Sequence, residues 1–369
     1  MSRRLPSWLE GLANASRDHG PYKISERALE LHRRLTVIDL HADPLMWSRD
    51  LLVRNHYGHV DIPRLIEGGV ALQVFSTVTH SPLGINIRRN RTDAPDMIKA
   101  LAMVAGWPRA AWDGKLERAL FQARALAFAV KNSGGRMAQV LSQGDLRTLA
   151  AKPRPGATAA MLSIEGGQCF EGRLESIDTL FDAGVRMVGL THFVDNDLGG
   201  SASGEVKGGL TDFGRAALKR MEDKRIVIDL AHASPKLFDE VLDACTRPPV
   251  VSHTGACSAC PNERNLTDDQ LKKIAAKDGV VGVGYWKTAT GGDDAAAIAR
   301  SIQVVMKVAG ARTAALGSDF DGAVAAPFDA SGIPLVTQAL LEADMGEDDI
   351  ASVMGANVLR LLSEGLPAN

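Results

Sequence analysis

The chain has few cysteines and few aromatic residues for its length, with four cysteines and 5% Phe, Trp and Tyr among 369 residues. Four cysteines in so long a chain do not make a disulfide framework, which favours a reducing setting. Cys257 and Cys260 form a single CxxC motif, but no second ligand pair for a structural zinc is visible, and no thioredoxin-like context surrounds it. We therefore interpret the cysteines as packing or loop residues.

The chain also lacks an excess charge and a long apolar segment. Its 42 Lys and Arg residues against 44 Asp and Glu leave a net charge of −2, which gives no reason to expect nucleic acid or an anionic membrane as a partner. The apolar runs are short and interrupted by charges, so no transmembrane span is expected. Neither a signal-peptide core nor a lipid-anchor tail is visible. These features predict a cytoplasmic protein without a membrane anchor.

Eight short apolar segments, most of them separated by helical patterns, dominate the rest of the sequence. We predict strands at residues 36–43, 71–79, 159–164, 186–190, 226–232, 249–253, 279–285 and 313–319. Segments that are apolar throughout suit parallel strands buried on both faces. Eight such units predict a (β/α)8 TIM barrel of the α/β class. An open doubly wound sheet is the alternative, but no Gly-rich phosphate fingerprint follows the first strand.

The patterns divide the chain into a lead-in and one domain. Residues 1–35 read as a polar lead-in that ends in a helix over 25–35, and residues 36–369 as a single barrel domain. A helical excursion, residues 81–155, separates the second and third strands, with helical patterns near 93–105 and 116–132. The other predicted helices lie at residues 61–69, 174–183, 215–223, 235–246, 268–277, 294–309, 335–342 and 348–362.

Residue types that bind metals gather where the predicted strands end, which is where a barrel of this kind forms its active site. The candidates are His41, Asp43, Glu165, His192, His232, His253 and Asp319. Because His41 and Asp43 stand two apart on a strand, they face the same side. Four of the nine histidines are in this set, and His80 follows the second strand. Random placement would scatter histidines into helices and surface loops.

These ligands exceed what one catalytic zinc needs, since three protein ligands suffice for it. They fit two metal ions that share a bridging carboxylate and a bridging hydroxide. Imidazole and carboxylate suit Zn²⁺, with Mn²⁺ and Fe²⁺ as alternatives. A metal-activated water would attack a carbonyl, and a carboxylate would pass its proton to a leaving amine. Structural roles stay open for single residues: Glu165 as a helix cap, His192 as a buried core histidine.

Seven motifs occur in order from residue 36 to the C-terminal helices: Asp39-Leu40-His41-Ala42-Asp43, Ser163-Ile164-Glu165-Gly166-Gly167, Leu190-Thr191-His192, Asp229-Leu230-Ala231-His232-Ala233-Ser234, Val251-Ser252-His253-Thr254, Arg264-Asn265-Leu266-Thr267-Asp268 and Gly317-Ser318-Asp319-Phe320-Asp321-Gly322. In these motifs the chain resembles the membrane dipeptidase (renal dipeptidase) family, peptidase family M19 of the amidohydrolase superfamily. The resemblance implies a (β/α)8 barrel metallopeptidase that holds two Zn²⁺ ions per chain and hydrolyses small dipeptides, including L-Xaa-D-Xaa. It also implies a homodimer.

The resemblance assigns metal ligands by motif match. His41 and Asp43 would bind one zinc, and His232 and His253 the other. Glu165 would bridge the two ions.

Three further roles come from the same motif match. Asp319 would lie at the first metal and act as the proton shuttle when a metal-bridging hydroxide attacks the peptide bond. His192 would bind the substrate by polarising the scissile carbonyl and would stabilise the oxyanion. Arg264 would bind the C-terminal carboxylate of the substrate, for which a bidentate guanidinium is well suited.

The chain departs from the vertebrate members of the family around the expected pocket. Gln168 stands where those members usually have His, and the loops 193–214 and 284–286 also differ. The side-chain preference at either substrate position therefore stays open. One alternative is another amide, N-acyl-amino-acid or lactone hydrolase that uses the same two metals. A non-catalytic, ligand-binding barrel is a second alternative, disfavoured because every motif ligand is present.

Overall fold

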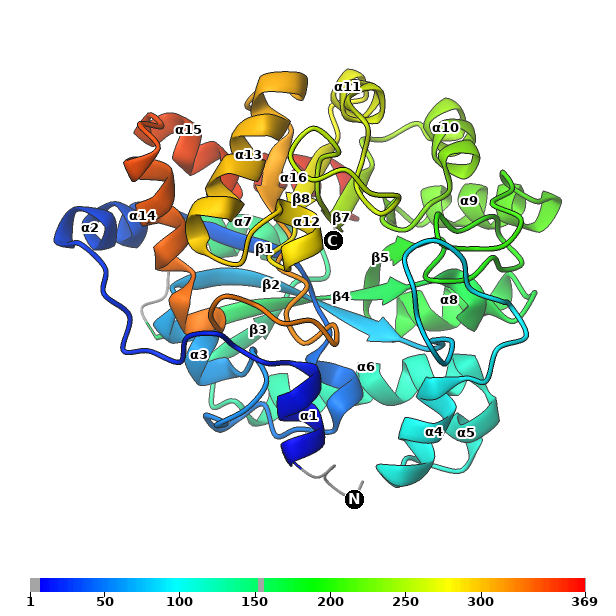
Figure 1. The fold of residues 1–369 in the computed structure, drawn as a ribbon. Coiled ribbons are helices and arrows are strands. Elements are labelled where there is room, and N and C mark those ends of the chain that lie inside the picture. The colour runs from blue at the N-terminus through cyan, green and yellow to red at the C-terminus, as the bar shows by residue number, and fades with distance from the viewer. Residues whose placement is uncertain (1–6, 152–155, 369) are drawn as a thin grey trace.

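Eight parallel strands close into a barrel surrounded by helices (Figure 1). A computed structural model describes residues 7–151 and 156–368, so the start of the predicted lead-in, the end of the predicted excursion and the last residue lie outside the described residues. The barrel strands run in the order β2-β1-β9-β8-β7-β6-β5-β4, and β2 pairs with β4 to complete the ring. The predicted TIM barrel is confirmed, and the closed ring excludes an open sheet.

The barrel strands are short and buried. They are β1 (Val37–Ala42), β2 (Val70–Val78), β4 (Thr158–Glu165), β5 (Val185–Gly189), β6 (Val227–Asp229), β7 (Val250–Thr254), β8 (Val280–Val283) and β9 (Ala314–Leu316). Every residue of β1 and β4 is buried, as expected for strands with helices outside and packed side chains inside. The pairing of β2 with β4 runs in register up to Val78 and Glu165, which carries Glu165 to the C-terminal mouth of the barrel.

The predicted helices are present, with ends shifted by a few residues. They are α2 (Glu26–Arg34), α3 (Ile62–Glu67), α4 (Met97–Val104), α6 (Lys115–Asn132), α8 (Glu175–Asp182), α9 (Asp212–Asp223), α10 (Pro235–Ala244), α11 (Asp268–Ala276), α13 (Ala295–Ala309), α14 (Pro334–Glu342), α15 (Glu347–Ala351) and α16 (Asn357–Gly365), with a π-helical segment between the last two. Side-chain caps fix several starts: Ser234 accepts the N–H of Leu237, and Thr267 forms a capping box with Gln270. Within the described residues, no helix has both the length and the apolar character that crossing a bilayer requires.

Four α-helices and one β-strand of the described residues were not predicted. They are α1 (Ser7–Ala13), α5 (Ala110–Asp113), β3 (Met137–Gln139), α7 (Gln143–Ala151) and α12 (Lys287–Thr290). Strand β3 pairs with the first half of β4, from Met137 opposite Thr158. Elements of three or four residues are too short for a hydrophobic period to be visible, which explains most of these omissions.

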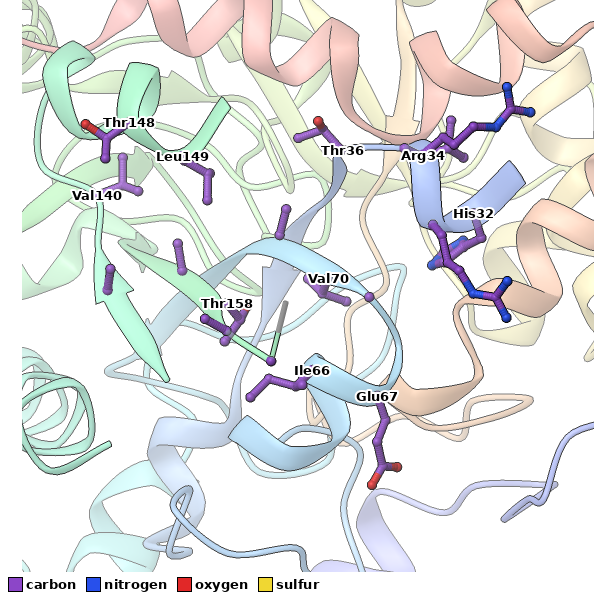
Figure 2. A pocket seen from close by; sticks show the side chains of 18 of the residues that line it. His32, Arg34, Thr36, Ile66, Glu67, Val70, Val140, Thr148, Leu149 and Thr158 are labelled. Carbon is purple, nitrogen blue, oxygen red and sulfur yellow. The ribbon is translucent and has the colours of Figure 1, made fainter. Parts of the chain in front are cut away.

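A cavity of about 900 Å³ lies at the other end of the barrel, where β1, β2 and β4 begin (Figure 2). Its wall is largely aliphatic around Val70 and Val140, with Arg34 and Glu67 at its rim. Arg34 is already paired with Glu347. None of the metal-type residues found at the strand ends lines this cavity. The chemistry indicated by the sequence therefore belongs to the opposite face.

A buried ionic cluster ties α1 to the barrel mouth. Arg49, which follows β1, pairs with Glu10 of α1 and with Asp321, which follows β9; the three side chains are at most 2% exposed. Asp321 also accepts the backbone N–H groups of His59 at 2.7 Å and Val60 at 3.0 Å. Burial alone would raise the pKa of Asp321, but Arg49, with His59 and Arg64, outweighs it and the pKa is lowered. Asp321 is therefore a buried carboxylate that depends on Arg49.

Replacing Arg49 should test this dependence. We expect Arg49→Met to lower the free energy of unfolding by about 3–5 kcal/mol, because it leaves a buried carboxylate without its counter-ion. Urea denaturation measures the change. Lys219→Met is the control: it removes an exposed ion pair with Asp223, whose side chains are 76% and 57% exposed, and should change stability little. Similar small losses in both variants would contradict the dependence on Arg49.

Candidate metal centre

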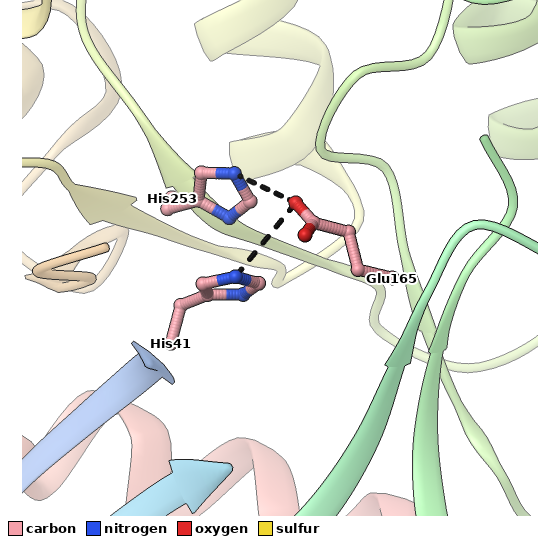
Figure 3. A group of neighbouring side chains, drawn as sticks. All are labelled: His41, Glu165 and His253. Carbon is pink, nitrogen blue, oxygen red and sulfur yellow. Dashed lines mark ion pairs between the residues drawn. The ribbon is translucent and has the colours of Figure 1, made fainter. Parts of the chain in front are cut away.

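Three imidazole rings converge on one carboxylate at the barrel mouth. Oε1 of Glu165 lies 3.1 Å from Nε2 of His232, 3.3 Å from Nε2 of His253 and 3.7 Å from Nε2 of His41. Figure 3 shows the rings of His41, from β1, and His253, from β7, both directed at Glu165. All four side chains are buried. This single carboxylate oxygen is therefore the common neighbour of three histidines, each from a different strand end.

Two further carboxylates adjoin His41. Oδ2 of Asp43 lies 3.3 Å and Oδ1 of Asp319 4.0 Å from its Nε2. The potential ligand atoms form three groups, each within 4.8 Å: His41 with Asp43 and Asp319, His41 with Glu165 and His253, and Glu165 with His192 and His232. The structure thus brings together every residue that the sequence singled out at the strand ends.

Two of these residues lie beyond the strands on which they were predicted. The strand predicted over 226–232 ends at Asp229, and the one predicted over 313–319 ends at Leu316, so both predictions were wrong at their C-terminal ends. His232 and Asp319 instead occupy left-handed turns, with φ of 62° and 60°. Such a conformation costs a non-glycine residue about 1–3 kcal/mol and clusters at functional sites. Here it turns both side chains into the mouth.

The buried charges favour a cation at this position. Burial raises the pKa of Glu165 well above its usual range, and the carboxylate of Asp43 adds to the rise. Burial also raises the pKa of Asp319 to about 8. For His232 and His253, burial lowers the pKa well below the usual range, which keeps both rings neutral, as metal ligation requires.

The pKa of His41 shows that the neighbouring carboxylates favour a positive charge. Burial lowers its pKa, but Asp43 and Glu165 outweigh that effect and raise it to about 10. Without a metal, a proton on His41 is the cation that these carboxylates find. A metal ion would take that place and return the ring to its neutral, ligating form.

An unpaired carboxylate oxygen and a close pair of imidazole nitrogens fit metal ligation as well. Oδ1 of Asp43 is buried and has no hydrogen-bond partner in the part of the chain that the structure describes. Nε2 of His232 and Nε2 of His253 lie only 3.0 Å apart. One ring can donate a hydrogen bond to the other at this distance, and if neither Nε2 carries a proton, a cation between the two lone pairs would satisfy both. Nitrogen and carboxylate donors without sulfur suit Zn²⁺, Mn²⁺ or Fe²⁺, so the residues present fit the expected metals.

Arg264 lies beside this centre, in the loop after β7. Its Nη2 donates to the carbonyl oxygen of His253 at 2.8 Å, and its guanidinium carbon lies 5.9 Å from the ring centre of Trp286. It is buried, and it forms no salt bridge with any other described residue. The backbone therefore holds Arg264 in place while its charge stays available for an anionic group.

His192 faces Glu165 as well, with Nε2 3.5 Å from Oε2. Its Nδ1 lies 3.3 Å from the carbonyl oxygen of His80. A carbonyl only accepts hydrogen bonds, so this contact places the single proton of a neutral ring on Nδ1. Burial lowers the pKa of His192 to about 3, which favours that neutral ring. The oxyanion role implied by the resemblance stays a prediction, and it requires a second proton, on Nε2.

Four polar residues beneath the ligands received no role from the sequence: Asp39, Asp229, Ser252 and Ser318. Oδ2 of Asp229 accepts the Ser252 hydroxyl at 2.6 Å, and Oδ2 of Asp39 accepts the Ser318 hydroxyl at 2.6 Å. Each aspartate stands in an Asp-Leu pair shortly before a candidate histidine, and each serine directly precedes a candidate ligand. This repetition is the signal by which the sequence could have indicated them.

Comparison with known proteins places the chain in a family. The family model described as membrane dipeptidase (peptidase family M19) matches residues 25–366. Dipeptidase aclJ of Aspergillus oryzae is 34% identical over 220 residues, which is 57% of this chain and only 52% of the length of that protein. An uncharacterized protein in the pqqA 5' region of Klebsiella pneumoniae is 31% identical over 250 residues, covering 63% of this chain and 90% of that protein.

A solved structure shares the fold. The metallo peptidase from Rhodobacter sphaeroides, liganded with a phosphinate mimic of the dipeptide L-Ala-D-Ala, aligns with a TM-score of 0.73 at 22% identity, over 90% of this chain and 99% of that chain. The family match extends over nearly the whole barrel, including every candidate ligand. The chain belongs to the membrane dipeptidase family, peptidase family M19.

Proposed function

We propose that this protein is a binuclear zinc dipeptidase that hydrolyses small dipeptides, including L-Xaa-D-Xaa. The observation that carries the proposal is the carboxylate of Glu165, which lies between imidazoles from opposite sides of the barrel mouth, with Arg264 beside it. Membership of the family supports a metal-dependent peptidase. The L-Ala-D-Ala mimic named for the Rhodobacter relative supports a D-residue at the C-terminal position. A homodimer and a cytoplasmic location stay predictions.

The two metal ions would be held by two separate pairs of ligands. His41 and Asp43 would hold one, His232 and His253 the other, and Glu165 would lie between them. When bound, such ions lower the pKa of water and act as Lewis acids toward a carbonyl oxygen.

The protein's own residues bind the substrate and move the proton. Arg264 would hold the terminal carboxylate through two parallel hydrogen bonds. Asp319, at the edge of the centre, would take a proton from the attacking water and deliver it to the amine nitrogen as the carbon–nitrogen bond breaks. The remaining hydroxyl stays on the carbonyl carbon, so the products are two amino acids. His192 would contact the scissile carbonyl.

Metal removal and restoration should test the activity and the metal count together. Chelation should abolish turnover of L-Ala-L-Ala and L-Ala-D-Ala, and titration with Zn²⁺ should restore it fully only at two ions per chain. Amine release gives the rate, and elemental analysis gives the metal content. Fully loaded protein that hydrolyses no dipeptide in a broad panel would contradict the proposed activity. Full activity at one ion per chain would contradict the binuclear centre alone.

Replacing Asp319 by Asn should separate proton transfer from substrate binding. We expect kcat to fall about 10²–10⁴-fold, because general acid–base catalysis contributes on that order. KM should change little, because Arg264 is retained. Metal content is measured on the same sample. A loss of less than tenfold in a variant that keeps both ions would show that another group moves the proton.

Substitutions of Arg264 should discriminate between substrate classes. Charge-assisted hydrogen bonds contribute about 1.5–3 kcal/mol, so Arg264→Ala should lower kcat/KM for dipeptides by roughly 10–150-fold. Arg264→Lys keeps the charge without the bidentate geometry, so its kcat/KM for dipeptides should lie between those of the wild type and Arg264→Ala. Turnover of a lactone or ester without a carboxylate should be nearly unchanged. Equal losses on both substrates would contradict the assigned contact, and faster turnover of the lactone by the wild type would favour the alternative hydrolase.

A further inference from the structure

Two of the metal-type imidazoles share one hydroxyl group. Oγ of Ser252 lies 2.9 Å from Nδ1 of His253 and 3.3 Å from Nδ1 of His41. The two rings lie against each other, with centroids 3.9 Å apart and planes inclined by 41°. Their Nε2 atoms face Glu165 on the opposite edge (Figure 3). The ring pair is therefore held between the Ser252 hydroxyl on one edge and the Glu165 carboxylate on the other.

Asp229 sets the direction of these hydrogen bonds. Its Oδ2 lies 2.6 Å from Oγ of Ser252, while its Oδ1 accepts the backbone N–H groups of Ser252 at 2.8 Å and Ala231 at 2.9 Å. A hydroxyl has one proton to donate and two lone pairs that accept. Because a carboxylate only accepts, the proton of Ser252 goes to Asp229. Both lone pairs of the hydroxyl are then left for the N–H groups of the two rings.

We propose that Ser252 is a positioning residue that fixes the tautomer of two metal-binding histidines at once. With the Nδ1 protons of His41 and His253 donated to Ser252, both Nε2 atoms keep their lone pairs for the metals. The two histidines belong to different halves of the proposed centre, so one hydroxyl couples both halves. This inference rests on the proposed two-metal centre.

The position of Ser252 makes its hydroxyl hard to replace. The residue lies on β7, directly before His253, and is fully buried. Removing the hydroxyl leaves two buried N–H groups without their partner, and an unsatisfied buried polar group is costly. Each ring would then be free to move its proton to Nε2, the atom that must bind metal.

Ser318 offers a matched control. It is equally buried, directly precedes Asp319, and donates to Asp39 as Ser252 donates to Asp229. Its hydroxyl also lies 3.0 Å from the carbonyl oxygen of His41, but among the described residues it contacts no ring nitrogen. Ser318→Ala therefore removes the same atom at the same depth without touching an imidazole.

The experiment compares the zinc-loaded wild type, Ser252→Ala and Ser318→Ala. Histidine ¹⁵N–¹H spectra should show slowly exchanging Nδ1 protons assigned to His41 and His253 in the wild type and in Ser318→Ala, and should lack both in Ser252→Ala. Competition with a chelator should show that Ser252→Ala weakens the binding of both zinc ions by about 10–100-fold, the usual effect of losing such a partner. Ser318→Ala should leave the ion at His232 and His253 within about threefold of the wild-type affinity.

Persistence of both Nδ1 protons in Ser252→Ala, with unchanged zinc affinity, would overturn the inference. A wild type that binds no second zinc would instead overturn the two-metal centre. The spectra distinguish the two outcomes, because they report the Nδ1 protons independently of the zinc count. Ser252→Cys provides a second variant if the alanine variant does not fold, since sulfur fills the space but accepts hydrogen bonds weakly. It should lose the same protected protons.

Discussion

The convergence of three imidazole nitrogens on Oε1 of Glu165 is the contact on which the rest of the site depends. Glu165 is the last residue of β4, and the pairing of β4 with β2 is also what closes the barrel. Closing the ring and placing the shared carboxylate are therefore one structural event. A buried carboxylate is unfavourable without a cation beside it, and in the absence of a metal ion a proton on His41 provides that charge. A cation bound at this point would therefore stabilise the folded barrel.

Beneath this contact, two Asp–Ser pairs link strands through side chains where backbone pairing ends. Asp229 on β6 accepts both the N–H and the hydroxyl of Ser252 on β7. Asp39 on β1 likewise accepts the N–H of Ser318 at 2.7 Å and its hydroxyl at 2.6 Å. Both carboxylates are buried and fully engaged, which is the condition under which a buried polar network stiffens a structure. The serine of each pair directly precedes a candidate ligand, His253 or Asp319, so these contacts help to fix where those two residues lie.

The fold was predictable because its eight strands are apolar runs long enough to be visible. The candidate metal ligands were predictable because they stand where those runs stop. The turns at His232 and Asp319 were not predictable in this way. The segment 226–231, which is apolar except for Asp229, continues past the end of β6. The strand ends where the Asp229 carboxylate accepts the backbone N–H of Ala231. Because this is a side-chain contact, the hydrophobic pattern of the sequence does not indicate where the strand ends. The proton on each imidazole is equally hidden from the sequence, because it depends on neighbours from three strands.

The proposed sharing of one hydroxyl would tie the rings of His41 and His253 to the barrel strands. The rings of His41 and His253 are fixed by β1, β7 and Ser252, all inside the barrel. The loops that cover the mouth are joined to each other instead: Nδ2 of Asn90 donates to the carbonyl oxygens of Phe193 and Ser203, each at 3.1 Å. A change in those loops can therefore reshape the pocket without moving the rings of His41 and His253. His232 is different, because its carbonyl oxygen accepts the N–H of Ala202 in one of these loops at 2.8 Å. The loop differences that the family resemblance indicates are therefore compatible with unchanged positions of His41 and His253, and substrate preference is the property that we expect to vary.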